Sequence, residues 1–176
     1  MERLLICGTN WLGDSIMSMP AIQSLKQNRP DVHVTLLVKP GMVPLWEMHG
    51  AIDAIVPIDQ GRGGTRLTAR ALKQQSLDRA VIFPNSFRSA LLPFLGGVPR
   101  RVGVADHWRR LLLTEPRPGR RADDTSHQAF EYFRLLDLAP PDQIPAPRIA
   151  PDEAARNEAE RLLGGGDDRP WVAMLP

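Results

Sequence analysis

Short apolar segments alternate with segments of helical periodicity along most of the sequence, and this alternation constrains the fold more than any other feature. Four times, a run suited to a buried strand precedes a run whose apolar residues recur at helical spacing. The predicted strands are residues 4–7, 32–38, 54–58 and 80–83, and the helices after them begin at Asp14, Gly41, Leu67 and Ser86. Parallel strands need crossover connections, which helices supply. We therefore predict an α/β fold, a Rossmann-like parallel sheet with helices on both faces.

The pattern continues beyond these four units. Val102–Val104 predicts one more strand, and the apolar face of residues 126–138 predicts a helix. Both extend the same layered arrangement, so we expect residues 1–145 to form one Rossmann-like domain.

A second unit is expected after this domain. Five prolines crowd residues 140–151, a composition typical of a linker between domains. Residues 152–163 then predict a helix, and residues 171–175 predict a buried strand. Residues 146–176 would therefore supply a linker helix and the first strand of a second domain. Because the sequence ends as that strand opens, we expect it to be a fragment.

The composition is that of an ordinary globular protein and excludes several classes. Hydrophobic residues make up 43% of the sequence, but no apolar run approaches the roughly 20 residues that a membrane span needs. The first residues lack the pattern of a secretory signal, so we expect a cytoplasmic protein. The net charge of +2 gives no reason to expect a nucleic-acid partner.

The sequence contains little that would support a disulfide bond or a metal site. Cys7 is the only cysteine, which rules out an internal disulfide. The histidines, cysteine and acids show no spacing typical of a metal site, so we expect neither a metal nor a cofactor.

The turn after the first predicted strand holds the first candidate site, because open parallel sheets bind ligands at the carboxyl ends of their strands. The residues from Gly8 to Ser15 imitate a phosphate-binding P-loop, but Asp14 stands where that motif has lysine. Asp14 has two possible roles. It could be the N-cap of the following helix, or an ionised general base that faces the cleft.

Asn85, Ser86 and Arg88 occupy the equivalent turn after the strand at residues 80–83. Asn85 and Ser86 could cap the next helix or hydrogen-bond a hydroxylated ligand, and Arg88 could pair with an anionic group. His127 could be a helix-surface residue or part of the site. Six arginines at positions 100, 101, 109, 110, 117 and 120 form either an anion-attracting stretch or a solvated basic loop.

Two segments carry a family resemblance. Arg3–Ile22, which contains Gly-Thr-Asn-Trp-Leu-Gly-Asp-Ser, and Pro84–Ala90, Pro-Asn-Ser-Phe-Arg-Ser-Ala, resemble the ADP-heptose:lipopolysaccharide heptosyltransferases of glycosyltransferase family 9, nearest to the type II branch. Arg101–Gly103 and His127–Leu136 extend the likeness. The resemblance implies the N-terminal half of a two-domain GT-B fold, which binds the acceptor, while the other half binds ADP-heptose. It also implies that Asp14 is the base that deprotonates the acceptor hydroxyl.

The resemblance implies inverting transfer of L-glycero-D-manno-heptose from ADP-heptose to the lipopolysaccharide inner core, with the fragment alone inactive. The acceptor-binding residues that it implies are Asn10, Trp11, Gly13, Asn85, Ser86, Arg88, Arg101 and His127. Peripheral contact with the cytoplasmic membrane face is a further expectation. Two alternatives stay open: a family-9 transferase for another sugar nucleotide, and a non-catalytic Rossmann-like sugar-binding module.

Overall fold

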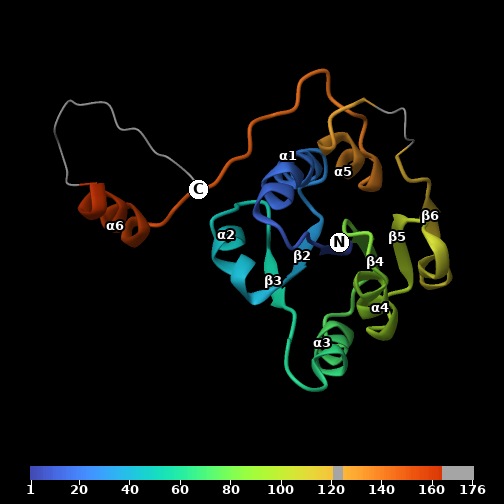
Figure 1. The fold of residues 1–176 in the computed structure, drawn as a ribbon. Coiled ribbons are helices and arrows are strands. Elements are labelled where there is room, and N and C mark those ends of the chain that lie inside the picture. The colour runs from blue at the N-terminus through green and yellow to red at the C-terminus, as the bar shows by residue number, and fades with distance from the viewer. Residues whose placement is uncertain (121–124, 164–176) are drawn as a thin grey trace.

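A computed structural model of the chain describes residues 1–120 and 125–163 and contains one parallel sheet in the order β3-β2-β1-β4-β5-β6 (Figure 1). Its strands are β1 (Arg3–Cys7), β2 (His33–Val38), β3 (Ala54–Pro57), β4 (Arg79–Ile82), β5 (Arg100–Val104) and β6 (Glu115–Arg117). Every neighbouring pair runs parallel. The predicted Rossmann-like α/β fold is confirmed.

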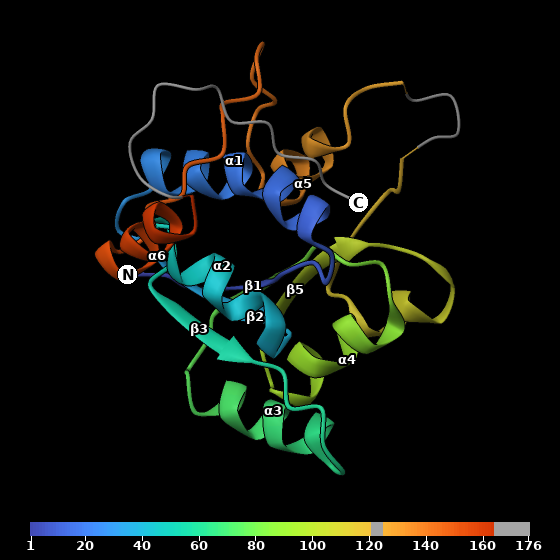
Figure 2. The same ribbon diagram turned by 60° about the vertical axis from the view of Figure 1, so that its left-hand side comes forward.

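Helices cover both faces of this sheet. The helices of the described residues are α1 (Leu12–Asn28), η1 (Pro40–Met42), α2 (Val43–Glu47), α3 (Gly64–Lys73), α4 (Phe87–Leu95), η2 (His107–Leu112), α5 (Ala129–Leu135) and α6 (Glu153–Leu163), of which α6 lies apart from the sheet. Figures 1 and 2 show α1, α2 and α5 on one side of the sheet and α3 and α4 on the other. Within the described residues, no helix is both long and apolar enough to cross a membrane.

The side chains of β1 point alternately into two separate hydrophobic cores. Leu4 and Ile6 pack into the core beneath α1, α2 and α5, whereas Leu5 and Cys7 pack into the core beneath α3, α4 and η2. Side chains of a strand point alternately to opposite faces, so a central strand covered on both sides must be apolar throughout. Burial on both faces therefore explains the unbroken apolar run of β1.

The strand order creates a topological switch point between β1 and β4. The chain leaves β1 into α1 on one face and leaves β4 into α4 on the other face. The turns after these adjacent strands therefore diverge and leave open space at the carboxyl edge of the sheet. Both sequence-predicted candidate turns lie at this point.

Several element boundaries differ from prediction. Helix α1 begins at Leu12 with Trp11 at the N-cap position, so the N-cap interpretation of Asp14 is wrong and Asp14 lies in the first turn. Helix α5 is shorter than the predicted 126–138. Strand β6 was not predicted, because Glu-Pro-Arg has no strand pattern and forms only by pairing with β5. The strand predicted at 171–175 lies outside the described residues.

The proline-rich segment is tied to the domain beside it. The Gln23 side chain donates to the Ala146 carbonyl at 3.1 Å and accepts from the Arg148 N–H at 2.7 Å. The Ala150 N–H donates to the Met48 carbonyl at 2.8 Å. Chain contacts with α1 and α2 thus continue to residue 150, and the domain boundary between residues 145 and 146 stays a prediction.

Close packing at Gly8 predicts a stability effect. A Cβ atom on Gly8 would lie 2.6 Å from Val38 Cγ1, because the end of β1 approaches β2 closely here. We expect Gly8→Ala to lower the free energy of unfolding by about 1–3 kcal/mol, the usual cost of overpacking a core. Gly13→Ala is the matched control, since nothing lies within 4 Å of a Cβ there. Urea unfolding of both variants measures this, and equal stabilities would contradict it.

Candidate functional site

A cavity of about 340 Å³ opens at the switch point and contains Asp14. Three segments far apart in the sequence form its wall: the turn from β1 to α1, the turn from β4 to α4, and α5. The lining residues are Thr9, Asn10, Trp11, Asp14, Phe83, Pro84, Asn85, Ser86, Gln128, Glu131 and Tyr132. The structure therefore brings together the two turns that the sequence singled out.

The turn from β1 to α1 is held by its own hydrogen bonds, and these leave one acceptor unused. The Gly8 N–H donates to the Leu37 carbonyl at 2.9 Å, and the hydroxyls of Thr9 and Ser15 share a hydrogen bond of 2.9 Å. Asn10 Oδ1 is buried but has no hydrogen-bond partner among the described residues. Buried polar atoms are nearly always paired, so this oxygen fits a ligand donor.

Asp14 is half-buried in the first turn of α1, where the helix dipole favours a negative charge. Its carboxylate forms no ion pair or hydrogen bond within the described part of the chain. Burial, followed by the charge of Asp14, raises the pKa of Tyr132 to about 12. The Tyr132 hydroxyl therefore stays protonated at neutral pH and can donate a hydrogen bond into the cavity.

Helix α5 supplies site residues that the sequence reasoning missed. Gln128, Glu131 and Tyr132 line the cavity of Asp14, and the Tyr132 ring packs on Phe83 with centroids 4.8 Å apart. The apolar face of this segment predicted only core packing. Polar groups at spacings of three and four residues were the signal that could have identified a second face.

In the turn from β4 to α4, one of the predicted roles, the helix cap, is confirmed. Ser86 caps α4, and its hydroxyl accepts from the Ser89 N–H at 3.2 Å. The Asn85 side chain is exposed to the cavity, with its Oδ1 accepting from Arg109 Nη1 at 3.2 Å. Arg88 is exposed and forms no ion pair within the described residues.

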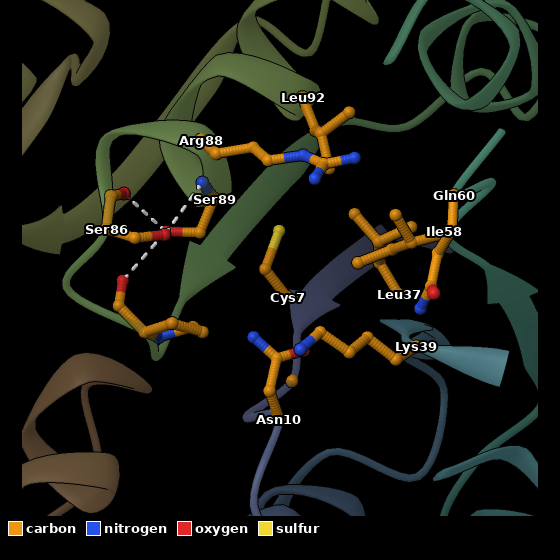
Figure 3. A pocket seen from close by; sticks show the side chains of 12 residues that line it. Cys7, Asn10, Leu37, Lys39, Ile58, Gln60, Ser86, Arg88, Ser89 and Leu92 are labelled. Carbon is orange, nitrogen blue, oxygen red and sulfur yellow. Dashed lines mark hydrogen bonds between the residues drawn. The ribbon is translucent and has the colours of Figure 1, made fainter. Parts of the chain in front are cut away.

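A second cavity of about 320 Å³ adjoins the first, and Asn10 and Ser86 belong to the walls of both. In Figure 3 the Lys39 side chain runs toward Asn10, while Arg88 extends across the opposite side next to Leu92. None of the described residues that line this cavity is acidic. Two cations without a carboxylate make it suitable for an anion. Lys39 and Gln60 were not predicted, because they come from the ends of β2 and β3.

Cys7 lies at the floor of this second cavity. Burial raises the pKa of its thiol to about 12, so the thiolate is not populated near neutral pH. Cys7 is a packing residue of the core beneath α3 and α4.

Arg101 is not brought to the carboxyl edge, so the structure does not place it beside the other acceptor-binding candidates. It lies at the amino end of β5, where its guanidinium donates to the carbonyls of Val98 at 2.5 Å and Leu112 at 2.7 Å. It also lies over the Phe94 ring, 5.3 Å from the centroid. The N–H donors of its guanidinium are thus directed to backbone carbonyls of the protein itself.

The other arginines of the basic stretch do not form an open anion-attracting loop either. Arg100 pairs with Glu115 at 2.8 Å, and Arg117 pairs with Asp137 at 2.7 Å. Arg120 donates to a backbone carbonyl, and Arg109 is buried. Arg110 is exposed. Tertiary partners, which the sequence order does not reveal, decide these outcomes.

The remaining candidates occupy different surroundings. His127 Nδ1 accepts from the Ala129 N–H at 3.1 Å and so caps the beginning of α5, while the neighbouring Gln128 lines the cavity. Trp11 is exposed and lines the cavity of Asp14, whereas Gly13 is exposed outside its lining. Within the described residues, no group of histidine, cysteine and acidic side chains could hold a metal ion.

Known proteins match both the sequence and the fold. Residues 65–176 match the sequence model of glycosyltransferase family 9 (heptosyltransferase). Lipooligosaccharide heptosyltransferase 2 of Haemophilus ducreyi is 30% identical over 99% of this chain and 53% of its own length. Lipopolysaccharide heptosyltransferase 2 of Escherichia coli is 30% identical over 65% of this chain and 34% of its own length. The structure of E. coli ADP-heptose lps heptosyltransferase II has a TM-score of 0.76 at 25% identity, covering 97% of this chain and 53% of that chain.

The chain spans about half, or less, of the length of these relatives. Its parallel sheet corresponds to one half of a GT-B heptosyltransferase, in agreement with the fold predicted from the sequence. The family match covers well over half of the chain, including the turn after β4 and helix α5. The chain therefore belongs to glycosyltransferase family 9, the heptosyltransferase family.

Proposed function

We propose that this chain is the acceptor-binding part of an inverting heptosyltransferase that transfers heptose from ADP-heptose to the lipopolysaccharide inner core. The family membership and the printed names of the relatives support this substrate pair. The observation that carries the proposal is the cavity at the switch point, where an unpaired carboxylate, Asp14, stands among groups able to bind a sugar. The donor would be held mainly by the part of such an enzyme that this chain does not span.

Asp14 would act as the general base. Its carboxylate accepts the proton of an acceptor hydroxyl while the hydroxyl oxygen bonds to the anomeric carbon of the heptose. The bond from that carbon to the diphosphate breaks, and ADP leaves with the electron pair from the opposite side. Attack opposite the leaving group inverts the anomeric configuration, and the proton remains on Asp14.

Neutral polar groups in the same cavity would orient the acceptor. Asn10 Oδ1 offers an acceptor without an internal partner, and the protonated Tyr132 hydroxyl offers a donor. Asn85 lines the same cavity. Such a set can fix a sugar ring by its hydroxyls and leave one hydroxyl facing Asp14.

The second cavity would hold an anionic group of the acceptor. Lys39 and Arg88 project from opposite sides, and Ser86 and Ser89 add hydroxyls near the amino end of α4. The helix terminus favours negative charge, and the two cations would pair with a carboxylate or phosphate on an acidic inner-core sugar.

Asp14→Asn tests the assigned base. In the gene extended past Pro176, we expect kcat to fall by about 10²–10⁴, because the amide cannot accept the proton. The melting temperature should fall only slightly, since Asp14 forms no hydrogen bond or ion pair with the described residues and the variant loses only the interaction with the helix dipole. Asp31→Asn, the same change on an exposed loop before β2, is the matched control. Normal turnover by Asp14→Asn would remove Asp14 from the mechanism.

The same assay separates the alternatives for the protein as a whole. Transfer from ADP-heptose to a heptosylated inner-core acceptor is measured for the extended protein and for the 176-residue chain side by side. Transfer by the extended protein alone supports the proposal. Acceptor binding without transfer by either would instead favour another sugar nucleotide or a non-catalytic binding module.

Charge removal in the second cavity should weaken acceptor binding selectively. Lys39→Gln and Arg88→Gln should each raise the acceptor KM about tenfold and leave kcat nearly unchanged, as expected when a charge-assisted hydrogen bond is lost from binding alone. Arg70→Gln on the exposed side of α3 is the control. An acceptor stripped of its anionic groups should abolish the difference. Unchanged KM values with the intact acceptor would contradict the role of this cavity.

A surface beside the site favours contact with the membrane face. Trp108 and Leu111 are 78% and 75% exposed, three residues apart on η2, where such residues lie on the same side. They line one apolar cavity with Phe87, and the exposed Arg110 lies between them in the sequence. Aromatic and aliphatic side chains near a cation suit an anionic bilayer surface.

Vesicle sedimentation tests this surface. The extended protein should bind vesicles that contain phosphatidylglycerol, and Trp108→Ala with Leu111→Ala should weaken binding about tenfold or more, because two apolar side chains no longer insert. Leu67→Ala, which removes an exposed leucine on α3, is the control. Equal binding by the double variant and the wild type would show that this surface is not the membrane contact.

A further inference from the structure

Arg109 is buried at the carboxyl edge, where the charges of Asp106 and Glu131 act on its guanidinium but form no ion pair with it among the described residues. Its relative exposure is 3%, and each hydrogen bond that its guanidinium forms with the described residues goes to an uncharged oxygen. Its Nε has no partner there. A buried guanidinium in such surroundings costs stability, so packing alone gives no reason for an arginine at this position.

The hydrogen bonds of Arg109 join two strands to the β4–α4 turn. Nη1 donates to the Val104 carbonyl at 2.6 Å and to Asn85 Oδ1 at 3.2 Å, and Nη2 lies 3.5 Å from the Ile82 carbonyl oxygen. A Cβ atom on Gly103 would lie 2.9 Å from Nη2, so the glycine in β5 makes room for the guanidinium. Arg109 thereby spans the ends of β4 and β5 and reaches the side chain of the turn.

A guanidinium only donates hydrogen bonds, and this fixes the orientation of the Asn85 amide. The atom that faces Arg109 must be Oδ1, so the NH₂ group faces away from it. Asn85 also belongs to the wall of the cavity that contains Asp14. Without Arg109 the amide could rotate and present either its donor or its acceptor to a ligand.

We propose that Arg109 is a positioning residue that locks the Asn85 amide with its NH₂ group as a fixed donor to an oxygen of the acceptor sugar. This rests on the proposed function. A hydroxyl oxygen that accepts from Asn85 directs its own proton elsewhere, and Asp14 in the same cavity is the group that would receive it. The lock thus selects a hydroxylated ligand and sets the direction of proton transfer.

A double-mutant cycle on the extended enzyme tests the lock. Arg109→Lys keeps the charge and one donor for the strand ends but loses the planar fork, and Asn85→Ala removes the locked amide. We expect the acceptor KM to rise about tenfold for Asn85→Ala and about fivefold for Arg109→Lys. The double variant should match Asn85→Ala within about twofold, with an unchanged donor KM, because Arg109 acts on the acceptor through Asn85.

Asn85→Asp gives a second measurement, on a variant that we expect to fold like the wild type. The carboxylate keeps the contact with Arg109 but presents an acceptor oxygen where the NH₂ group was. We expect the acceptor KM to rise as it does for Asn85→Ala, without a lower melting temperature. A wild-type acceptor KM for Asn85→Asp would overturn the inference.

The cycle also distinguishes the proposed positioning role of Arg109 from a purely structural one. A purely structural Arg109 would give effects that multiply with those of Asn85→Ala and would raise both KM values together with a loss of thermal stability; that outcome overturns the inference. Failure of the wild type to transfer heptose counts against the proposed function instead. In that case the acceptor Kd of each variant in the cycle is measured by calorimetry. The same non-additivity in Kd supports the positioning role of Arg109, and absence of acceptor binding refutes it.

Discussion

The structure depends on β1 being a central strand with apolar side chains on both faces. Leu4 and Ile6 enter one core, and Leu5 and Cys7 enter the other, all nearly inaccessible to solvent. Because β1 pairs with β2 on one side and β4 on the other, the chain must cross the sheet on both faces. The divergence of the two following turns is a consequence of this arrangement, and the open edge between them is where polar side chains can gather without disturbing either core.

The site is assembled at that edge by elements with different tasks. The β1–α1 turn supplies the carboxylate and the Asn10 amide, whose oxygen has no partner among the described residues, and the β4–α4 turn supplies a helix cap and a second amide. Helix α5 closes the cavity with Tyr132, whose ring packs on Phe83 and whose hydroxyl stays protonated. Strands anchored in two cores hold these groups more rigidly than loops alone could, which suits the proposed role of orienting a sugar.

The sequence predicted the fold and the two turns for one reason: in a parallel sheet, local patterns determine which turns share an edge. It could not predict which side chains from elsewhere would join them. Gln128 and Lys39 reach the cavities through the packing of α5 and the pairing of β2 with β1. Arg100 and Arg117 are paired with Glu115 and Asp137, acids that only the folded chain brings close to them. The first helix was predicted to begin at Asp14, two residues after its observed start at Leu12, which is an ordinary error for a helix boundary.

The two cavities differ in charge, and this difference fits the base that we propose at Asp14. No lysine, arginine or histidine lines the cavity of Asp14 among the described residues, whereas Lys39 and Arg88 line the adjoining one. A cation beside a carboxylate stabilises its ionised form and makes it a weaker base, yet an acidic ligand needs cations to bind. Asn10, Pro84 and Ser86, which are uncharged, form the shared wall. The edge can thus attract an anion at one side and keep an unpaired carboxylate at the other.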